Sequence, residues 1–480
     1  MRTVSAKPPA VPVSTFPLRA VTVDKYDGKE SERLSESSIE YSLDKPLPET
    51  LPTGFPSSEG KAVARVALIG FGNVGRSVAK ILCEPKSENS GLELTHIFNR
   101  NAARKKQSWV PSHVIWSEDL QSIPQCGADI IVELIGGLHP AEDLVRRALN
   151  AGKSVVTANK QLIARHGTEL LQLASAKGCQ LEFGASVAGG VPVLPALRTG
   201  LCGDRLHGIA GILNGTCNYI LSRIESDRIP FSEALEEAQA RGYAEADASE
   251  DLDGGDARAK LAILALAGLQ VQVAPSEIRA RTIRTIEAVD FDYAAELGCT
   301  IRQIARADLK DNLLFAEVGP SLVPAPSPFG RVQKNLNMVL TSGEYGGDVA
   351  FLGAGAGGDP TAVAVVSDLM SVAENLSEGP RTHRPLQIPS PRVSCDFETP
   401  WYLRFVVKDQ PGIIAGLAAI LSAHYLNIDA VLQKPGFEKT ALPFVITLEP
   451  CSDAQLQPAL QKMSEMDFSL RPCLCLPILR

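Results

Sequence analysis

Apolar positions come in short runs separated by helix-like stretches through the early part of the chain. The run Ala62–Ile69 is almost entirely apolar and rich in β-formers, as is typical of a strand buried on both faces. Strands of this kind are expected in a parallel sheet whose crossover connections are helices. The same pattern predicts further strands at Leu92–Phe98, Asp129–Ile135 and Ser154–Thr157, and helices at Ser77–Cys83 and Ala141–Asn150.

The pattern changes at about residue 191, where helical and β-like stretches alternate less regularly. We therefore expect an α+β substrate and dimerisation domain over residues 191–344, after an α/β domain over residues 61–190. A glycine-rich segment, Gly353–Gly358, precedes an apolar helix, and residues 345–377 are expected to return to the first domain. The helical stretches are Phe231–Arg241, Ala257–Leu269 and Thr361–Ala373, and the clearest β-like stretch is Leu314–Val318.

The last part of the chain predicts a separate small module. Residues 378–400 contain many Pro, Arg and Ser residues and are expected to be a linker. Residues 401–480 then follow the order strand, helix, strand, strand, helix, strand. The expected elements are Trp401–Val407, Ile413–His424, Ile428–Leu432, Leu442–Leu448 and Asp453–Met466, followed by a final apolar strand.

Length, charge and cysteine usage narrow the classes of function. A chain of 480 residues is long for one core and is expected to form two or three domains. The net charge of -8 argues against nucleic acid or a membrane surface as a partner, and no apolar run reaches the roughly 20 residues of a membrane helix. The ten cysteines lack the spacing of a zinc site or a disulfide framework, which favours a reducing, cytoplasmic location.

The N-terminal segment, residues 1–60, is rich in Pro, Ser and Glu and is expected to be a flexible extension. Its first 20 residues have no acidic side chain and contain Arg2, Lys7 and Arg19, a composition loosely typical of a transit peptide. Four prolines in the same stretch disfavour the amphipathic helix of such a peptide. Organellar import therefore stays open as an alternative to a cytoplasmic location.

Three glycines at G-x-G-x-x-G spacing follow the first predicted strand and precede a helix. Gly70 permits a tight turn, Gly72 lets a pyrophosphate approach the backbone, and Gly75 allows the helix to pack closely on the strand. The start of the helix adds unpaired N–H groups and a positive partial charge for the phosphates. This context predicts a Rossmann-like dinucleotide-binding domain, although a structural glycine turn would use the same residues.

The end of the second predicted strand bears on the choice of cofactor. An NAD-binding domain tends to place Asp or Glu there, to bind the ribose 2′-hydroxyl. Residues 98–105 contain no carboxylate, and they carry Arg100, Arg104 and Lys105. Such cations would attract a 2′-phosphate, so we expect NADP as the cofactor, with NAD and a merely solvated basic turn as the alternatives.

An acidic stretch followed by a lysine is the strongest chemical signal in the chain. Six carboxylates fall between Glu245 and Asp256, and Lys260 follows on an otherwise apolar helix. Asp256 and Lys260 are four residues apart and therefore share a helix face. A lysine on a buried helix requires a carboxylate partner or a chemical task. By itself the stretch is equally consistent with a charged helix entry.

The spacing of this stretch resembles the signature of homoserine dehydrogenases. The matching positions are Ala238, Gly242-Tyr-Ala, Asp247, Asp251-Leu, Gly254, Asp256 and Lys260. One position departs, because the family usually has proline where this chain has Ala248. Further matching segments are Val132–Gly137, Thr157–Lys160, Ala185–Pro192, Ile212–Leu221 and Gly353–Thr361, so that the resemblance covers residues 62–377.

The resemblance implies reversible, NAD(P)H-dependent reduction of L-aspartate 4-semialdehyde to L-homoserine, a step in threonine, methionine and isoleucine biosynthesis. Lys260 would be the general acid that protonates the aldehyde oxygen, with its pKa tuned by Asp256 and a dry site. Glu245 and Asp251 would bind the substrate ammonium, and Lys160 would bridge the cofactor and the substrate carboxylate. By the same resemblance, the residues lining the cofactor would be Phe71, Asn73, Val74, Ile135 and Gly357.

The resemblance also implies a monovalent cation such as sodium, held largely by main-chain carbonyls. In this chain those carbonyls would belong to Val187, Gly189 and Val191. A fourth position, just before Ala185, is usually glutamate in the family and is Gly184 here. The glycine keeps a carbonyl but offers no carboxylate for the site.

Residues 401–480 resemble an ACT domain, a module that pairs side by side and binds small amino acids. Asp409, Pro411 and Gly412 form the expected turn between the first strand and its helix, where Asp409 can accept N–H bonds, and Gln433 ends the next strand. The resemblance implies feedback inhibition by L-threonine, sensed at this turn in a homodimer or homotetramer. A module that only dimerises stays open as the alternative.

Two other functions remain open on the sequence. Another ACT-bearing dehydrogenase, acting on a 2-hydroxy acid, would require a catalytic His–Glu pair, and the seven histidines lie outside the motifs described above. A catalytically silent amino-acid sensor would explain the departures at Gly184 and Ala248.

Overall fold

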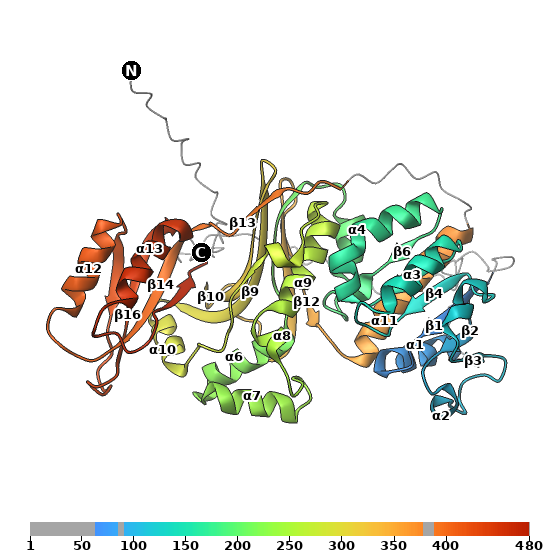
Figure 1. Cartoon of the computed structure of the whole chain (residues 1–480), viewed down its shortest axis with the longest axis horizontal. Coiled ribbons are helices and arrows are strands. Elements are labelled where there is room, and N and C mark those ends of the chain that lie inside the picture. Colours follow the sequence, from blue (N-terminus) through green and yellow to red (C-terminus); the bar gives the residue numbers. More distant parts are fainter. Residues whose placement is uncertain (1–62, 85–90, 378–387, 480) are drawn as a thin grey trace, which may run out of the picture.

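The computed structural model describes residues 63–84, 91–377 and 388–479, and the expected N-terminal extension lies outside them. Its described strands form three sheets. Figure 1 shows the first sheet at one end of the molecule, the C-terminal sheet at the other, and the long strands of the second sheet between them. No helix within the described ranges is long and apolar enough to cross a membrane.

The first sheet is parallel, with the order β3-β2-β1-β4-β5-β6, which confirms the predicted Rossmann-like arrangement. Its buried strands are the apolar runs that the sequence pattern indicated. The strands are β1 (Ala64–Ile69), β2 (Leu92–Phe98), β3 (Ile115–Ser117), β4 (Ile130–Glu133), β5 (Ser154–Thr157) and β6 (Leu181–Glu182). The helices are α1 (Asn73–Cys83), α2 (Ala102–Lys105), α3 (Ala141–Asn150) and α4 (Lys160–Ala176).

Helix α11 (Gly358–Ser377) returns to this sheet from far along the chain and packs against α1. Its side chains Ala362, Val365 and Leu369 share a core with Val66 and Val78. In Figure 1 the orange α11 lies beside the blue and green elements of the first sheet. Of the residues 345–377 expected to return to the first domain, α11 does so, whereas Gly347–Ala354 form β12 of the second sheet.

The second sheet is mixed, with the order β12-β11-β7-β9-β10-β13 and a short strand, β8, on β10. Its strands are β7 (Leu206–Ile212), β8 (Arg279–Ala280), β9 (Cys299–Lys310), β10 (Leu313–Pro324), β11 (Leu336–Gly343), β12 (Gly347–Ala354) and β13 (Arg392–Ser394). The helices around it are α5 (Val193–Pro195), α6 (Gly215–Asp227), α7 (Phe231–Ala240), α8 (Ser249–Leu252), α9 (Gly255–Leu264) and α10 (Ala288–Glu296). A π turn, Ala265–Leu269, continues α9 over the range predicted as one helix.

The C-terminal sheet is antiparallel, with the order β15-β16-β14-β17. Its strands are β14 (Glu398–Val407), β15 (Ile428–Leu432), β16 (Leu442–Ser452) and β17 (Leu474–Pro477), and its helices are α12 (Ile413–Ala423) and α13 (Asp453–Ser464). The predicted order of six elements is confirmed. We call residues 398–479 the C-terminal module.

The expected linker, residues 378–400, is partly structured where it is described. Strand β13 pairs in parallel with β10, and β14 already begins at Glu398. The module also shares an apolar core with the second sheet, in which Tyr402 and Leu476 contact the cluster that contains Ile220. The module is therefore packed against the rest of the chain and not merely tethered to it.

Candidate active site

Asp256 lies between two lysines that come from different parts of the fold. The Asp256 Oδ2 atom is 2.7 Å from Nζ of Lys260, and Oδ1 forms an ion pair with Nζ of Lys160. Lys260 also donates a hydrogen bond of 2.8 Å to the carbonyl oxygen of Leu213. The side chains of Asp256 and Lys260 are 3% and 12% exposed, whereas Lys160 is 39% exposed. One carboxylate thus holds two ammonium groups at the edge of the interior.

Local sequence explains how each lysine reaches this carboxylate. Helix α9 begins at Gly255, directly after Gly254 in a left-handed conformation (φ 81°), so Asp256 lies in its first turn and Lys260 one turn later. Helix α4 begins at Lys160, where the Asn159 side chain caps it by accepting a 3.1 Å bond from the Leu162 N–H. Both helices begin at the site, which brings their first-turn side chains together.

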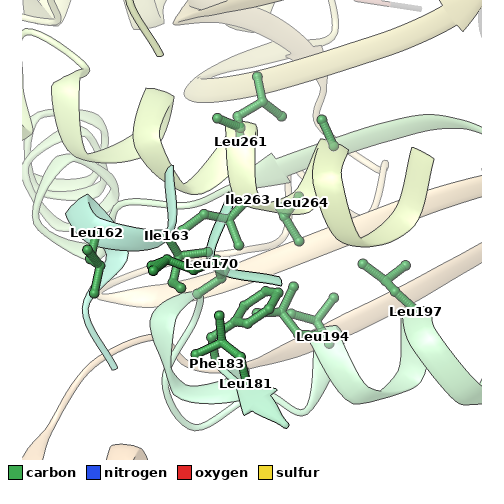
Figure 2. Packing of buried hydrophobic residues seen from close by; sticks show 14 of the residues in the cluster. Leu162, Ile163, Leu170, Leu181, Phe183, Leu194, Leu197, Leu261, Ile263 and Leu264 are labelled. Atoms are coloured by element: carbon green, nitrogen blue, oxygen red, sulfur yellow. The ribbon is translucent and has the colours of Figure 1, made fainter. Parts of the chain in front are cut away.

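A buried apolar cluster fixes α4 against α9. Ile163 and Leu170 of α4 pack with Ile263 and Leu264 of α9, all at most 1% exposed. In Figure 2 Ile263 and Leu264 of α9 face Ile163 and Leu170, with Phe183 near them, whereas Leu261 points to the opposite side of α9. Because close-packed interiors resist displacement, the separation between the starts of the helices, and hence between the two lysines, is set by this core.

The charges at the site are strongly coupled. Burial alone would raise the pKa of Asp256, but the ammonium groups of Lys260 and Lys160 outweigh it and hold that pKa below its usual range. Burial likewise would lower the pKa of Lys160, and Asp256 reverses the effect and raises it. Asp256 is therefore a stable anion, and it keeps Lys160 protonated.

Asn214 connects the lysine–aspartate pair to Asp251. Its Nδ2 atom donates to Oδ1 of Asp251 at 2.7 Å and to Oδ2 of Asp256 at 2.9 Å. Its Oδ1 accepts the N–H of Cys217 at 2.8 Å and so caps α6. Burial raises the pKa of Asp251 despite this bond from Asn214, and the neighbouring Asp256 carboxylate adds to the rise. The sequence analysis gave Asn214 no role of its own, although this residue lies in the matching segment Ile212–Leu221 and is of an N-cap type before Gly215.

Glu245 lies outside this cluster of hydrogen-bonded and ion-paired residues. It is exposed on the loop before α8, and its main-chain carbonyl accepts a 3.1 Å bond from Gln239. Within the described residues no hydrogen bond or ion pair involves its carboxylate. Of the two carboxylates expected to bind substrate, only Asp251 shares hydrogen-bonding partners with Asp256.

The three-glycine loop has the geometry that its spacing predicted. Gly70 has φ 102°, and a Cβ there would lie 2.8 Å from the Leu134 carbonyl oxygen. A Cβ on Gly75 would lie 2.1 Å from the Gly70 carbonyl oxygen, whereas one on Gly72 would meet open space. Gly70 and Gly75 are thus required by the turn itself, and Gly72 leaves free space in front of the start of α1, which has no side-chain cap.

The other expected cofactor residues surround the same loop. Phe71 is fully buried against Trp116, Val74 packs in the core behind α1, and Asn73 is exposed. Gly357 (φ 129°) precedes a segment that approaches α1, because Ser77 donates a 2.7 Å bond to Asp359. Ile135 is 38% exposed beyond the end of β4.

Buried Glu133 orders that end of β4 and was not anticipated. Its carboxylate accepts bonds from the N–H groups of Ile135 (2.9 Å) and Gly136 (3.1 Å) and from the Thr157 hydroxyl (2.6 Å). The network joins the ends of β4 and β5, after which Lys160 begins α4. The sequence signal for Glu133 was a carboxylate inside a buried strand.

The basic residues after β2 are arranged unequally. Arg100 and Arg104 are exposed, and the ammonium of Lys105 turns back to the Phe71 carbonyl oxygen at 3.4 Å. Asn99, at the end of β2, accepts a 3.0 Å bond from the Phe71 N–H. The exposed Arg100 and Arg104 side chains are therefore accessible to a ligand next to the glycine loop.

The segment expected to bind a cation is buried against the Gly-rich segment before α11. Val187, Gly189 and Val191 are buried, and Val191 alone uses its carbonyl oxygen in the fold, accepting the Val193 N–H at 2.8 Å. The carbonyls of Val187 and Gly189 accept no hydrogen bond from the described residues. At Gly184 the Asp368 carboxylate accepts the main-chain N–H at 2.7 Å and would stand 2.5 Å from a Cβ.

In the C-terminal module, Asp409, Pro411, Gly412 and Gln433 are exposed. Gly412 adopts φ 96° and begins α12, as the turn predicted. The Asp409 carboxylate is 3.6 Å from the Lys439 ammonium, and no hydrogen bond from the described turn residues reaches it. The expected capping of the turn by Asp409 is therefore absent from the described residues.

Comparisons with known proteins agree with this site. The family model for the homoserine dehydrogenase NAD binding domain matches residues 70–184, and that for homoserine dehydrogenase matches residues 192–370. The homoserine dehydrogenase of Bacillus subtilis is 33% identical over 84% of this chain and 95% of its own length. That of Synechocystis is 35% identical over 84% and 96%. The crystal structure of the Thiobacillus denitrificans enzyme superimposes with a TM-score of 0.80 at 32% identity, covering 86% of this chain and 98% of that one.

These matches span both the glycine loop and the lysine–aspartate site, so the alternative of another dehydrogenase class is wrong. The parallel sheet belongs to the NAD(P)-binding domain, and Asp256 and Lys260 lie on α9, which packs against the second sheet. The chain belongs to the homoserine dehydrogenase family and is an oxidoreductase of amino-acid biosynthesis.

Proposed function

We propose that the Lys260 ammonium is the proton donor when this homoserine dehydrogenase reduces L-aspartate 4-semialdehyde to L-homoserine. The observation that carries the proposal is the Lys260–Asp256–Lys160 arrangement, in which Lys260 is almost buried and is held by Asp256 and by the Leu213 carbonyl. NADPH held at Gly70, Gly72 and Gly75 would supply the hydride for the aldehyde carbon. Lys260 gives a proton to the aldehyde oxygen, and Asp256 fixes the direction of its N–H bonds.

Substrate recognition follows from the remaining charges. The Asp251 carboxylate, held by Asn214, binds the substrate ammonium, and Glu245 adds a second carboxylate from the exposed loop. Lys160 is held protonated by Asp256 and remains 39% exposed, so its other N–H bonds are available to the substrate carboxylate and the cofactor. A carboxylate for the ammonium and an ammonium for the carboxylate together orient an α-amino acid.

The cofactor is expected to be NADP, bound by Gly70, Gly72 and Gly75 and by the start of α1. Exposed Arg100 supports this choice, because residues 98–105 offer no carboxylate to a 2′-hydroxyl. Replacing Arg100 with glutamine should raise the KM for NADPH by at least about tenfold and leave that for NADH nearly unchanged. Equal effects on the two cofactors would contradict the assignment.

A monovalent cation fits the carbonyls of Val187, Gly189 and Val191. Two of these buried carbonyls accept no hydrogen bond from the part of the chain that the structure describes, and a buried unpaired carbonyl is costly unless a cation or a donor meets it. A cation bound there would stabilise the segment that joins the two sheets. Thermal denaturation in sodium chloride and in tetramethylammonium chloride at equal ionic strength tests this, because only sodium should raise the melting temperature.

The C-terminal module is proposed to be an ACT domain that senses L-threonine in a homodimer or homotetramer. Two observations support this proposal: the βαββαβ order of the module, and the exposed turn at Gly412 directly before α12. Adding L-threonine to the assay should lower the rate, and Gly412→Asp should relieve the inhibition. A rate that is unaffected by L-threonine would contradict the sensing role and favour the alternative, a module that only dimerises.

Turnover by the purified full-length chain tests the function itself. NADPH absorbance should fall when L-aspartate 4-semialdehyde is added, and L-homoserine should form in equal amount. Absence of turnover in a folded protein that binds NADPH would contradict the proposal and favour the silent sensor instead.

A further inference from the structure

One short segment, residues 279–287, contacts both the substrate-binding region and the C-terminal module. On one side the Ile283 N–H donates to the Leu252 carbonyl of α8 at 3.0 Å, and Arg284 Nε donates to Asp253 at 3.2 Å. Helix α8 also carries Asp251. The segment is therefore bonded directly to the helix that is proposed to bind the substrate ammonium.

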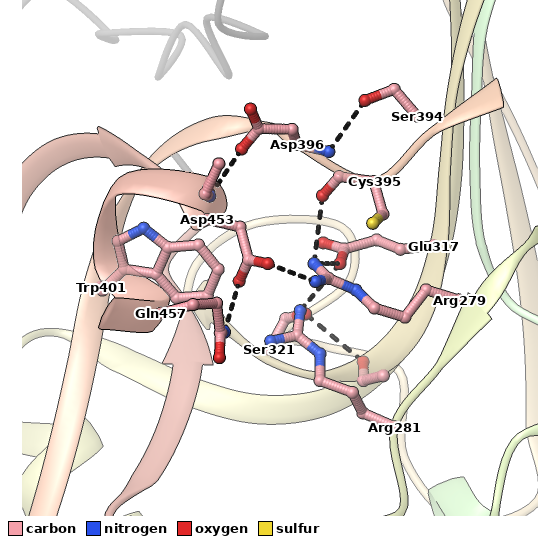
Figure 3. Close-up of polar contacts among 12 residues, drawn as sticks. Arg279, Arg281, Glu317, Ser321, Ser394, Cys395, Asp396, Trp401, Asp453 and Gln457 are labelled. Atoms are coloured by element: carbon pink, nitrogen blue, oxygen red, sulfur yellow. Dashed lines mark hydrogen bonds and ion pairs between the residues drawn. The ribbon is translucent and has the colours of Figure 1, made fainter. Parts of the chain in front are cut away.

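On its other side the same segment is bonded to the C-terminal module. Arg279 donates to Asp453 at the start of α13 (2.5 Å), and the Thr285 carbonyl accepts a 3.0 Å bond from Arg404 of β14. Figure 3 shows Arg279 between Glu317 of the second sheet and Asp453 of the module, with Arg281 and Gln457 next to them. Helix α8 and the module are therefore bonded to the same continuous stretch of main chain.

A cavity of about 1000 Å³ opens between this segment and the module, and we call it the junction cavity. Five arginines and two carboxylates line it: Arg279, Arg281, Arg284, Arg404, Arg471, Glu287 and Asp453. Val406, Leu460 and Leu474 supply an apolar wall. The turn at Asp409–Gly412 and Gln433 do not contribute to its lining, so the cavity is separate from the expected ACT ligand site.

The five arginines around the cavity are each paired with a carboxylate, so any attraction for an anion must come from guanidinium N–H donors that these pairs leave unused. Arg279 and Arg281 share Glu317 as a partner, and Arg404 and Arg471 share Glu287. A guanidinium has five N–H donors, so shared carboxylates leave donors unused. The Arg281 side chain in particular donates one hydrogen bond, of 2.8 Å to Glu317, among the described residues.

We propose that the junction cavity binds a small carboxylate with an aliphatic body, and that its occupancy is transmitted to α8. Guanidinium groups bind carboxylates with two parallel hydrogen bonds, and Leu460 and Leu474 offer the aliphatic body a surface that a hydrated inorganic anion would not use. Glu287, whose side chain is 40% exposed, adds a place for an ammonium if the carboxylate belongs to an amino acid. That occupancy of the cavity alters substrate binding through α8 rests on the proposed role of Asp251. Binding of the carboxylate in the cavity does not rest on that role.

Calorimetric titration of the full-length chain without cofactor tests the binding. The probes are 4-methyl-2-oxopentanoate and L-leucine, which share an aliphatic carboxylate and differ in the oxo and ammonium groups, and inorganic phosphate at equal ionic strength. At least one organic probe should bind with a Kd below about 1 mM, at least about tenfold more tightly than phosphate. Preference for L-leucine that Glu287→Gln abolishes assigns the ligand to amino acids, and preference for the oxo acid assigns it to plain carboxylates.

Three variants locate the site. Arg281→Gln and the more exposed Arg471→Gln should each weaken binding by at least about tenfold. Glu317 keeps Arg279 as its partner in the first variant, and Arg471 is 51% exposed, so both proteins should fold. Arg205→Gln, which removes an exposed guanidinium paired with Glu344 elsewhere, should leave the Kd unchanged.

Several results would overturn the proposal. They are the absence of binding by either organic probe up to about 10 mM, binding that survives both cavity variants, and phosphate binding as tight as that of the organic probes, which would mark an adventitious anion only. Hydrogen exchange of residues 249–253 tests the transmission and should slow when the cavity is filled. Unchanged exchange with intact binding would reject the transmission, and neither measurement depends on turnover.

Discussion

Asp256 distributes its two carboxylate oxygens among three nitrogen donors: Oδ1 pairs with Lys160, and Oδ2 accepts from both Lys260 and Asn214. Removing one donor leaves two others in place. Removing the carboxylate leaves two neighbouring ammonium groups without an anion between them. At the scale of single residues, the site therefore depends most on Asp256 for its charge balance.

Asp256→Asn should change how stability depends on pH. The pKa of Asp256 is lower in the folded chain than in the unfolded chain, so its carboxylate stabilises the fold at every pH above the unfolded value of about 3.9 and loses that effect as the pH falls through the folded value. Urea denaturation should thus find wild type more stable than the variant at pH 7, with a gap that narrows below about pH 4. A gap that stays constant with pH would contradict this account.

Asn214→Ala should weaken substrate binding more than it weakens the fold. The variant loses the bond to Asp251 and the cap of α6, and a lost cap costs about 1 kcal/mol. We expect the KM for L-aspartate 4-semialdehyde to rise at least about tenfold while the KM for NADPH stays the same.

Asn218→Ala is a matched control, because Asn218 lies on the same helix and donates to the Lys334 carbonyl at 3.0 Å without touching the acidic residues. It should lose stability but keep its KM. Equal KM changes in the two variants would show that Asn214 acts only through the helix.

At the scale of elements, the loop before α1 contains two kinds of glycine. Some are required by the turn itself, and Gly72 is proposed to serve cofactor binding. Gly72→Ala should keep the free energy of unfolding within about 0.5 kcal/mol, because its Cβ meets open space and its φ of -86° suits alanine. It should nevertheless weaken NADPH binding at least about tenfold, because a methyl group occupies the expected approach of the pyrophosphate.

Gly75→Ala is the matched comparison. Its Cβ would lie 2.1 Å from the Gly70 carbonyl oxygen, so the helix must move and the fold should lose about 1–3 kcal/mol. Thermal denaturation and NADPH titration of both variants test the distinction. A Gly72→Ala protein that binds NADPH like wild type would remove the role proposed for Gly72.

The elements that the sequence pattern predicted are those whose signal is local. Strand β1 is a buried apolar run, and Asp256 and Lys260 share a face of α9 because they are four residues apart. Asn214 lies 37 residues from Asp251 and 42 from Asp256, and no local pattern predicts bonds of that range. Strand β10 was predicted only over Leu314–Val318 and β9 was not predicted, because β9 buries polar side chains such as Arg302 and Gln303 and neither strand shows period-two alternation.

At the scale of the whole molecule, buried charges join the C-terminal module to the second sheet. Arg404 Nε is 2.6 Å from Asp290 Oδ1, and the Tyr402 hydroxyl donates to the same oxygen at 2.9 Å. Asp290 is fully buried, and burial raises its pKa in spite of Arg404. The resemblance indicated the module, whereas this connection depends on residues more than a hundred positions apart.

Arg404→Ala should therefore destabilise the full chain by about 3–5 kcal/mol, because it leaves a buried carboxylate without its cation. Arg471→Ala, which removes a half-exposed guanidinium at the same junction, should cost less than about 1 kcal/mol. Chemical denaturation compares the two. Similar small losses would mean that Asp290 does not depend on Arg404 for its burial.

The most direct test of the account is the kcat of Lys260→Ala with saturating NADPH and L-aspartate 4-semialdehyde. Asp256 keeps Lys160 as a partner in this variant, so the fold and NADPH binding should be preserved. We predict that kcat falls about 100- to 10,000-fold, the range expected when a general acid is lost. A kcat within about threefold of wild type would contradict the assignment of Lys260 as the proton donor.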